Sequence, residues 1–364
     1  MQMIKVIRIY LLVFVTLVII SCSSERPADK IALNNKPNVI LLIGDGMGLS
    51  QLSAAFYFGD SESNFARFKE VGLMMTSSAK HSITESGAAA TAFSIGEKTY
   101  NNAIGVNSDS ISSLNIVEVL SKKGYNTGVI STSSVTHATP ASFYAHVVDR
   151  SMQDKIAKQL VESEIDFFAG GGTSFFNSRI DSIDLIKKLR GNGFVINPET
   201  TSGKLDPAYK YGFLLADNAM PTILENRGDF LPDYTKLALD LFSQQQESFF
   251  LMVEASQIDW AGHDGNAEYL IAEVLDFDKT VGVAMDFATK HNNTLVIVLA
   301  DHETGGFTLA LKDGDYSIIG PTFASYGHSC NLVPVLAFGS GADSFRGIFQ
   351  NNEIFHKIMA VVNK

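Results

Sequence analysis

The chain has 364 residues, of which 46% are hydrophobic and 18% charged, and its formal net charge at pH 7 is −11. This length accommodates one large α/β domain or two smaller ones, and either arrangement buries a sizeable core. The acidic balance excludes nucleic-acid binding through a basic surface. It does not exclude small anionic substrates, because bound cations can reverse the charge locally.

The N-terminus has the pattern of an export signal. A basic start is followed by an apolar run, residues 9–20, that is too short to span a membrane comfortably. The run leads into Ile-Ile-Ser-Cys, ending at Cys22, which resembles a bacterial lipoprotein box. We therefore expect a cleaved signal peptide over residues 1–21 and a polar tether over residues 22–36, anchored to a membrane by a lipidated Cys22. The alternatives are an uncleaved anchor or an ordinary signal peptide. The expected location is the bacterial cell envelope, in the periplasm or at the cell surface.

After cleavage and lipidation, Cys330 is the one cysteine left for the folded part. An intramolecular disulfide is therefore not expected. Cys330 lies two residues after His328, which permits a metal-ligand interpretation. The better supported interpretation is a small buried residue.

Short apolar runs alternate with helical patterns along the chain. This alternation predicts an α/β fold with a single doubly wound, mostly parallel sheet and helices on both faces, in one domain over residues 37–364. Residues 173–232 have weaker periodicity and more Gly, Pro and Asn, and we interpret them as an irregular excursion from that domain. The expected strands are 38–43, 128–132, 166–169, 248–253, 294–300 and 333–338, and the expected helices are 112–123, 151–163, 233–246 and 267–290.

Acidic and imidazole side chains follow several of these strands. Asp45, Glu254 and the pair Asp301-His302 each come where an expected strand ends, and His328 lies shortly before the last strand. Ligands of open α/β sheets collect at the carboxyl ends of strands. A single Asp at such a point is more often a helix cap. Several carboxylates gathered there without cations would repel one another, so the convergence predicts bound metal ions.

The segment Glu254 to His263 carries a second pattern. Asp259 and His263 are four residues apart, so they lie on one face if the segment is helical. This spacing suits two ligands of one zinc ion. Glu254 sits where the preceding apolar run ends, in a position to serve another metal nearby.

Together these segments resemble the alkaline phosphatase family, in the family's order, over roughly residues 37–341. The resemblance implies that Ser86 is the nucleophile and that Arg150 binds phosphate. The matching motifs are Gly44-Asp45-Gly46-Met47-Gly48, Thr84-Glu85-Ser86-Gly87-Ala88, His137-Ala138-Thr139-Pro140-Ala141, Asp301-His302-Glu303-Thr304-Gly305-Gly306 and Tyr326-Gly327-His328.

The resemblance also implies two zinc ions and one magnesium ion. A first zinc with two imidazoles and one carboxylate leaves a coordination position open, and an all-oxygen third site suits magnesium. Two neighbouring zinc ions can bind the attacking and the leaving oxygen of an in-line displacement. The implied ligands are Asp259, His263 and His328 for the first zinc, Asp45, Asp301 and His302 for the second, and Asp45, Thr139 and Glu254 for magnesium.

Ser86 and Arg150 each have a plainer interpretation. Ser86 opens a run of small residues that reads as a helix start, so it is also a candidate helix cap. The predicted metal ligands favour a nucleophile, since metal coordination activates a serine hydroxyl. Arg150 offers a planar fork for two phosphate oxygens, and its alternative is a surface ion pair with Asp149.

Three positions depart from the family pattern. Glu85 stands where many members have aspartate, and we expect its longer side chain to place Arg150 differently and so to alter phosphate affinity. His137 and Trp260 stand where several members have Asp and Lys. We expect His137 to weaken magnesium binding or to admit another metal, and the uncharged Trp260 to let phosphate leave faster. The short segment between His302 and His328 predicts a reduced interface (crown) insertion, which leaves open whether two copies form a homodimer.

The function expected from this resemblance is hydrolysis of phosphate monoesters to an alcohol and inorganic phosphate through a phosphoserine intermediate. Phosphodiesterases, sulfatases and phosphonate hydrolases of the same superfamily are the nearest alternatives. Arg150 and the complete third metal site favour monoesters, and the C-x-P-x-R pattern of sulfatases is absent. A metal- or phosphate-binding lipoprotein without catalysis is a further alternative. The presence of Ser86 together with all of the expected metal ligands disfavours it.

Overall fold

A computed structural model describes residues 36–198 and 204–364. The predicted signal peptide, residues 1–21, and the predicted tether up to residue 35 lie outside the described residues. Lys36–Lys364 form one unit by their internal contacts. Within the two described ranges, no helix combines the length and apolar character needed to cross a membrane.

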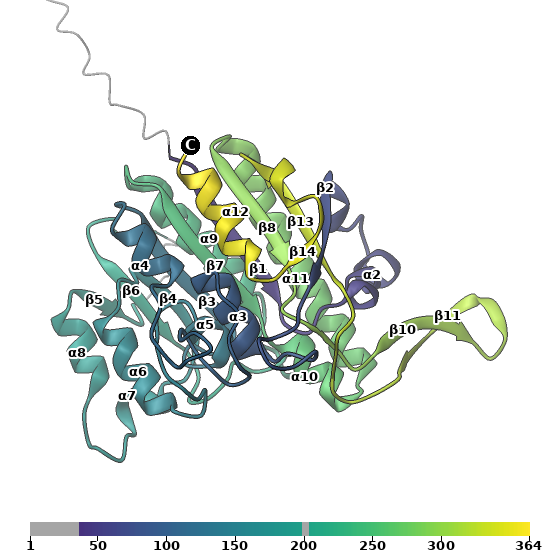
Figure 1. The fold of residues 1–364 in the computed structure, drawn as a ribbon, viewed down its shortest axis with the longest axis horizontal. Coiled ribbons are helices and arrows are strands. Elements are labelled where there is room, and N and C mark those ends of the chain that lie inside the picture. The colour runs from purple at the N-terminus through teal and green to yellow at the C-terminus, as the bar shows by residue number, and fades with distance from the viewer. Residues whose placement is uncertain (1–35, 199–203) are drawn as a thin grey trace, which may run out of the picture. The chain divides into compact units, whose positions relative to one another are not determined.

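A ten-stranded sheet forms the centre of this unit (Figure 1). Neighbouring strands are parallel except for β13, which runs antiparallel to both of its neighbours, β8 and β2. This confirms the predicted mostly parallel sheet. In spatial order the strands are β14 (Gly347–Gln350), β2 (Glu70–Met75), β13 (Val333–Gly339), β8 (Thr294–Leu299), β1 (Asn38–Gly44), β7 (Phe249–Ala255), β3 (Asn126–Ser134), β4 (Phe167–Gly171), β6 (Lys210–Leu214) and β5 (Phe194–Ile196).

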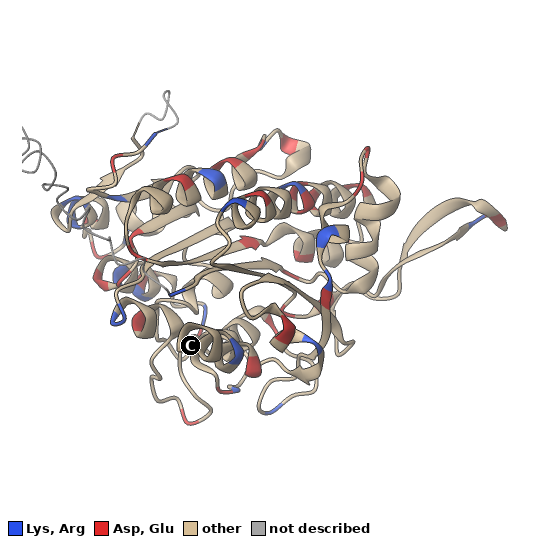
Figure 2. Ribbon diagram, turned by 90° about the horizontal axis from the view of Figure 1, so that it is seen from above, with Lys and Arg blue, Asp and Glu red and all other residues tan. Residues whose placement is uncertain are grey.

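Helices cover both faces of the sheet, as predicted (Figure 2). The longest, α11 (Ala267–Lys290), packs against α2 (Leu49–Phe58), α9 (Phe230–Gln244) and α10 (Gln257–Asp264). The remaining described helices are α3 (Ser86–Ile95), α4 (Ile116–Ser121), α5 (Ala138–Ala141), α6 (Gln153–Glu162), α7 (Ser174–Asn177), α8 (Leu185–Gly191) and α12 (Glu353–Val362), with short 3₁₀ turns η1 (Asn64–Arg67), η2 (Ile223–Glu225) and η3 (Ala342–Phe345).

The central strands are continuous apolar runs because helices cover them on both sides. Every residue of β7 and β8 is buried, as is β1 after its first residue. Such runs lack the alternation of a strand with one wet face. These buried strands keep a fixed register, so their ends hold the polar residues in fixed positions relative to one another.

Four features differ from the expectations. Residues 173–232 are not merely an irregular excursion, since β5, β6, α7 and α8 fall within or beside them and extend the sheet. The strands β2 and β14 at the opposite edge were not expected. Helix α4 begins only at Ile116, where Asn115 and Glu118 form a capping box. Cys330 is exposed, not buried. Short edge strands and surface residues have weak periodic signals, which explains why the pattern missed them.

The segment between His302 and His328 contains a two-stranded hairpin, β10 (Phe307–Lys312) and β11 (Asp315–Phe323), that extends away from the main sheet (Figure 1). Before and after it, β9 (Glu303–Thr304) pairs antiparallel with β12 (His328–Ser329). His328 is the register partner of Thr304. This small ladder returns the chain to the carboxyl end of β8.

Candidate metal centre

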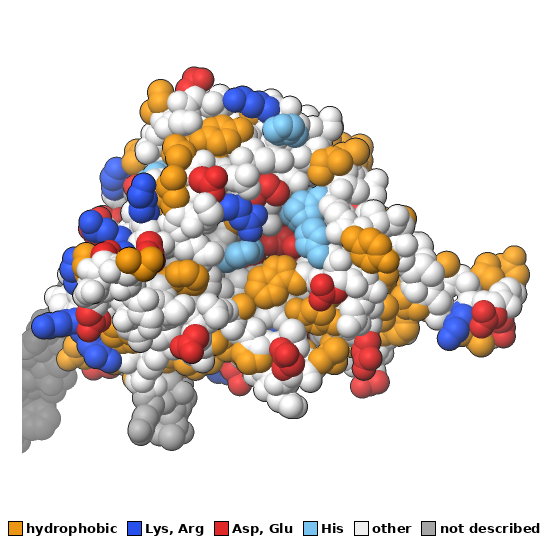
Figure 3. All heavy atoms as spheres, turned by 90° about the horizontal axis from the view of Figure 1, so that it is seen from below, with side chains coloured by type: hydrophobic (Ala, Val, Ile, Leu, Met, Phe, Trp, Pro, Cys, Tyr) orange, Lys and Arg blue, Asp and Glu red, His pale blue; other side chains and the backbone are white. Residues whose placement is uncertain are grey.

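Four adjacent strands deliver polar side chains to one edge of the sheet. Asp45 follows β1, Glu254 lies near the end of β7, Asp301 follows β8, and β3 leads to His137 and Thr139. The strands β8, β1, β7 and β3 are consecutive in the sheet, so their carboxyl ends meet. Figure 3 shows histidine side chains beside acidic ones in a hollow on this side, with a basic side chain next to them.

The loop after β1 reaches this edge through a close approach to α10. Gly46 has φ +71°, in the left-handed region that favours glycine. A Cβ at this position would lie 2.8 Å from both the Cα of Asp259 and the Oγ1 of Thr304. The backbone N–H of Gly46 donates to Asp301 Oδ1 at 3.0 Å. Only glycine allows Asp45 to be held this near to the other acidic residues.

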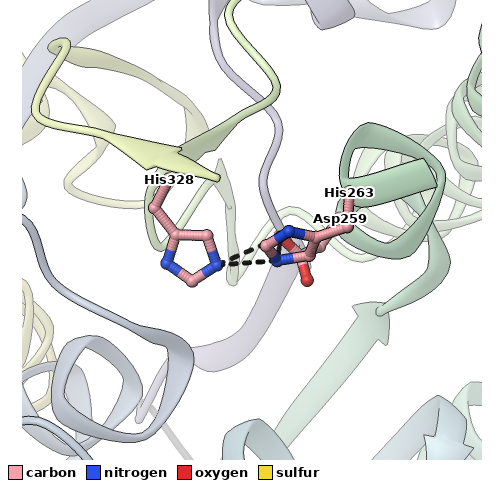
Figure 4. A group of neighbouring side chains, drawn as sticks. All are labelled: Asp259, His263 and His328. Carbon is pink, nitrogen blue, oxygen red and sulfur yellow. Dashed lines mark hydrogen bonds and ion pairs between the residues drawn. The ribbon is translucent and has the colours of Figure 1, made fainter. Parts of the chain in front are cut away.

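Asp259, His263 and His328 form the first ligand group (Figure 4). Asp259 and His263 are one helical turn apart on α10, as expected. The two imidazole Nε2 atoms are 3.0 Å apart. They lie 3.4 Å (His263) and 3.5 Å (His328) from Asp259 Oδ1.

Backbone carbonyls fix which nitrogen carries the hydrogen in the neutral form of these two rings. His263 Nδ1 lies 2.6 Å from the carbonyl of Tyr326, and His328 Nδ1 lies 2.9 Å from that of Thr84. A carbonyl only accepts, so each Nδ1 carries the hydrogen and each Nε2 presents a lone pair in the neutral ring. Two lone pairs and a carboxylate oxygen facing one another repel unless a cation lies among them, which fits a zinc ion.

Asp45, Asp301 and His302 form the second group, and all three are fully buried. His302 Nε2 lies 3.2 Å from Asp301 Oδ2 and 3.6 Å from Asp45 Oδ1. The hydroxyl of Thr304 donates to Asp259 Oδ1 at 2.5 Å, so in its 3.2 Å contact with His302 Nδ1 it accepts. His302 Nε2 is therefore an unprotonated donor atom for a metal.

Thr304 joins the two groups, yet we had not singled it out from the sequence. Its hydroxyl contacts Asp259 of the first group and His302 of the second. The signal was available in the motif Asp301-His302-Glu303-Thr304, where it stands two residues after a ligand. Imidazole rings also link the groups, since His302 and His328 stack with centroids 3.7 Å apart.

Three buried carboxylate oxygens in this centre carry no hydrogen bond: Asp45 Oδ1, Glu254 Oε1 and Asp301 Oδ2. Burial raises the pKa of each of these carboxyl groups, and for Asp45 the nearby charges of Asp301, Asp259 and Glu254 raise the pKa further. Burial also lowers the pKa of His302 to about 3, so the ring is neutral at pH 7. Unpaired buried acceptors are rare in folded proteins, and bound divalent cations would satisfy all three.

Asp45, Thr139 and Glu254 are brought together as an all-oxygen set. Thr139 Oγ1 donates to Asp45 Oδ2 at 3.5 Å, the outer limit of a hydrogen bond. Burial raises the pKa of Glu254, while the nearby hydroxyls of Ser131, Ser256 and Thr139 act in the opposite direction. This chemistry suits magnesium, with water completing the coordination.

Ser86 is the first residue of α3, but it does not cap the helix. The cap is Glu85, whose carboxylate accepts hydrogen bonds from the backbone N–H groups of Gly87 at 2.9 Å and Ala88 at 2.7 Å. The capping interpretation of Ser86 is therefore wrong. The buried Ser86 hydroxyl lies 3.4 Å from His302 Nε2, so it faces the second ligand group.

Arg150 is held at both ends of its guanidinium. Nη1 donates to Glu85 Oε2 at 2.5 Å, and Nη2 donates to His137 Nε2 at 3.0 Å. The ion pair is thus with Glu85 and not with Asp149, the expected alternative. Burial alone would raise the pKa of Glu85, but Arg150 and three backbone N–H groups outweigh it and lower the pKa. Burial, followed by the charge of Arg150, lowers the pKa of His137 to about 3, which leaves its ring neutral and able to accept.

Trp260 lies beside His137, one of the two residues that hold Arg150. Its ring meets the ring of His137 edge-on, with centroids 5.8 Å apart and an interplanar angle of 80°. Since His137 holds Arg150, two of the three positions that depart from the family pattern, Trp260 and His137, form one contact chain ending at the guanidinium. Trp260 adds an apolar face to the centre and no charge.

Comparisons with known proteins agree with this geometry. The family model for alkaline phosphatase matches residues 36–323. Alkaline phosphatase 3 of Bacillus subtilis is 37% identical over 77% of this chain and 63% of its own length. The alkaline phosphatase of Escherichia coli is 28% identical over 93% of this chain and 89% of its own. The solved structure of alkaline phosphatase from the Antarctic bacterium TAB5 superposes with a TM-score of 0.88, at 52% identity, covering 90% of this chain and 98% of that one.

Proposed function

Because this chain belongs to the alkaline phosphatase family, we propose that it hydrolyses phosphate monoesters to an alcohol and inorganic phosphate. The chain spans 63% of the first Bacillus relative and 65% of alkaline phosphatase 4 from the same organism, so the activity itself is a proposal. The observation that carries it is the buried Ser86 hydroxyl against the second ligand group, 3.4 Å from His302. The doubly held Arg150 adds a fork for phosphate oxygens.

We propose that the ligand groups hold two zinc ions and one magnesium ion. The first group would bind zinc through Asp259, His263 and His328, and the second through Asp45, Asp301 and His302. Ions bound there would supply Lewis-acid charge to the reacting phosphoryl oxygens and favour the deprotonated Ser86 hydroxyl. The facing imidazole lone pairs and the unpaired carboxylate oxygens support this assignment.

In the proposed reaction, Ser86 Oγ attacks phosphorus while the bond from phosphorus to the ester oxygen breaks and the alcohol leaves. Water then attacks the phosphoserine, which returns the Ser86 hydroxyl and releases inorganic phosphate. Arg150 would bind two phosphoryl oxygens through its planar fork, with Glu85 and His137 fixing its plane beforehand. Preorganisation of this kind avoids reorienting the clamp during reaction.

The identity of the third ion is a separate question because of His137. Two variants of the Antarctic enzyme, with one histidine replaced by aspartate or glutamate, are described with Mg bound in the M3 site. We propose that the half-buried, neutral His137 weakens magnesium binding here, because it withholds the negative charge that a carboxylate would provide. Elemental analysis of the purified protein, with and without His137→Asp, tests this proposal. A third ion that is magnesium at full occupancy in the unchanged protein would contradict it.

An assay separates the proposed activity from its superfamily alternatives. The purified chain would be offered an aryl phosphate monoester, a bis-aryl phosphodiester and an aryl sulfate at alkaline pH. We expect the monoester to be turned over fastest, with the rate lost on chelation and restored by adding Zn²⁺ and Mg²⁺. Faster turnover of the diester or the sulfate would reverse this assignment. No turnover of any ester by the metal-loaded protein would favour the non-catalytic alternative.

We also propose that Cys22 is lipidated and anchors the enzyme in the bacterial cell envelope. The support is the apolar run that ends at this cysteine and the polar stretch that follows it. Cys22→Ala expressed in a bacterial host should move from the membrane fraction to the soluble fraction. An unchanged distribution would contradict the anchor. Light scattering of the soluble form would also decide whether two copies pair.

A further inference from the structure

A cluster of buried hydroxyls surrounds the Glu254 carboxylate where β3 and β7 end. Ser131 on β3 is the register partner of Glu254 on the neighbouring parallel strand β7. Ser133 and Ser256 complete the cluster, and all four residues are fully buried. Hydroxyls buried in a central strand are unfavourable unless they are hydrogen-bonded. Their arrangement around one carboxylate therefore calls for an explanation beyond packing.

The hydrogen bonds in this cluster have a determined direction. Ser131 Oγ lies 2.5 Å from Glu254 Oε2 and 2.9 Å from Ser256 Oγ. A carboxylate oxygen accepts, so Ser131 gives its one proton to Glu254. Because that proton is committed, the Ser256 hydroxyl is the donor in its contact with Ser131. The backbone N–H of Ser133 also donates to Ser131 Oγ, at 2.9 Å, which fixes the hydroxyl against the strand.

The result is an asymmetric carboxylate. Glu254 Oε2 accepts from Ser131. The Ser133 hydroxyl lies 2.7 Å from Ser131 Oγ and 3.5 Å from the same Glu254 oxygen. The other oxygen, Oε1, is buried and has no hydrogen bond. We propose that Ser131 is a positioning residue that holds Glu254 by Oε2 so that Oε1 is presented to the third metal ion. This inference rests on the proposed function, since it assumes an ion bound by Asp45, Thr139 and Glu254.

Removal of the Ser131 hydroxyl should weaken the third site and leave the other two unchanged. Outer partners of metal ligands typically contribute a factor of about 10 to 100 in metal affinity. We expect Ser131→Ala to lower Mg²⁺ affinity by about that factor. The zinc content should not change, because the first and second ligand groups have their own outer partners, the Tyr326 and Thr84 carbonyls and the Thr304 hydroxyl.

Equilibrium dialysis of the zinc-loaded full chain against graded Mg²⁺, followed by elemental analysis, measures this without relying on activity. Ser134→Ala is the matched control, because it removes a hydroxyl from the same strand that bonds Thr136 Oγ1 at 3.1 Å instead of Glu254. We expect Ser134→Ala to bind Mg²⁺ as the unchanged protein does. Ser131→Cys keeps a similar volume with a weak donor, so it should also lose affinity. This second variant carries the test if Ser131→Ala does not fold.

The outcomes separate the two levels of the proposal. Mg²⁺ affinity in a folded Ser131 variant equal to that of the unchanged protein would overturn the positioning role alone. An equal loss in Ser134→Ala would also overturn it, because the effect would then belong to strand packing. An unchanged protein that binds no third ion would overturn the third metal site and this inference together.

Discussion

At the scale of single residues, Glu85 and Ser86 divide two tasks at the start of α3. The Glu85 carboxylate accepts hydrogen bonds from free backbone N–H groups at the helix start, so the Ser86 hydroxyl is not needed as a cap. Ser86 is left free to face His302 Nε2. A hydroxyl at the first turn also lies at the positive end of the helix dipole, which favours its anionic form.

Replacement of Ser86 tests its role as nucleophile. We expect Ser86→Ala to lower kcat/KM for an aryl phosphate by about three orders of magnitude or more, because no other oxygen takes its place against the metal groups. Ser94→Ala is the control, since Ser94 is a buried serine of the same helix whose hydroxyl bonds the Thr91 carbonyl. Both variants should keep the metal content of the unchanged protein. Activity retained by Ser86→Ala would show that water attacks the ester directly.

Trp260 is the residue that we expect to set product release. It contributes an apolar ring beside His137 and no charge. A lysine at this position adds a cation near the clamp, so Trp260→Lys should lower the inhibition constant for inorganic phosphate by about tenfold. Trp260→Phe, which keeps an aromatic ring, should leave it within about twofold. If Trp260→Lys leaves the inhibition constant unchanged, the charge at this position does not govern phosphate affinity.

At the scale of elements, the candidate metal centre lies where the strands end and short helices and loops begin. Helix α10 places Asp259 and His263 on one face, and the β9–β12 ladder returns His328 to them. Helix α3 depends on an acidic cap that also holds Arg150. Stability of that helix start and placement of the Arg150 guanidinium are therefore coupled through one carboxylate.

The contribution of Glu85 to stability should depend on pH with a definite sign. Its pKa is lowered in the fold, so it stabilises the protein above its unfolded pKa near 4.5, and this contribution is lost as pH falls through the folded pKa. We expect Glu85→Ala to lower the free energy of unfolding by about 1–2 kcal/mol at pH 7. The difference from the unchanged protein should shrink below about pH 4. Calorimetry measures both, with the exposed Glu247→Ala as control. A difference that stays constant in acid would contradict the assignment.

At the scale of the whole molecule, ten strands bring together acidic residues that lie far apart in the sequence. Asp45 and Asp301 lie far apart along the chain, yet Asp301 accepts a hydrogen bond from the N–H of Gly46 and both acidic residues contact His302. Burial raises the pKa of the carboxyl groups of Asp45, Glu254 and Asp301. Without cations, the ionised forms of these groups oppose folding.

Metal removal should therefore make stability pH-dependent. For a carboxyl group with a raised folded pKa, the folded state binds more protons between the unfolded and folded pKa values, so stability falls as pH rises through that window. We expect the melting temperature of the chelated protein to fall as pH rises above about 4, the ordinary carboxyl range. Adding Zn²⁺ and Mg²⁺ at pH 7 should raise it again. Scanning calorimetry with and without chelator checks this, and a chelated protein as stable at pH 7 as at pH 5 would contradict it.

Much of the fold and of the candidate ligand groups could be predicted from the sequence because their signals are local. Residues 267–290 have the pattern of one long helix, and α11 has those bounds. The strands β1, β7 and β8 were apparent as apolar runs since they are buried on both faces. Asp259 and His263 were paired by helical spacing, and strand ends pointed to Asp45, Glu254 and Asp301.

Tertiary structure alone decided which residues form hydrogen bonds with the candidate site residues. The cap at Glu85, the His137 contact to Arg150, the Thr304 link between two groups and the Ser131 bond to Glu254 join residues whose separation along the chain carries no periodic signal. Strand register determines such contacts, as in the pairing of Ser131 with Glu254. The sequence by itself determined what kind of atoms reach the centre, because residue type and strand ends are local properties. The direction in which each donor atom faces was decided by neighbours that only the folded sheet brings near.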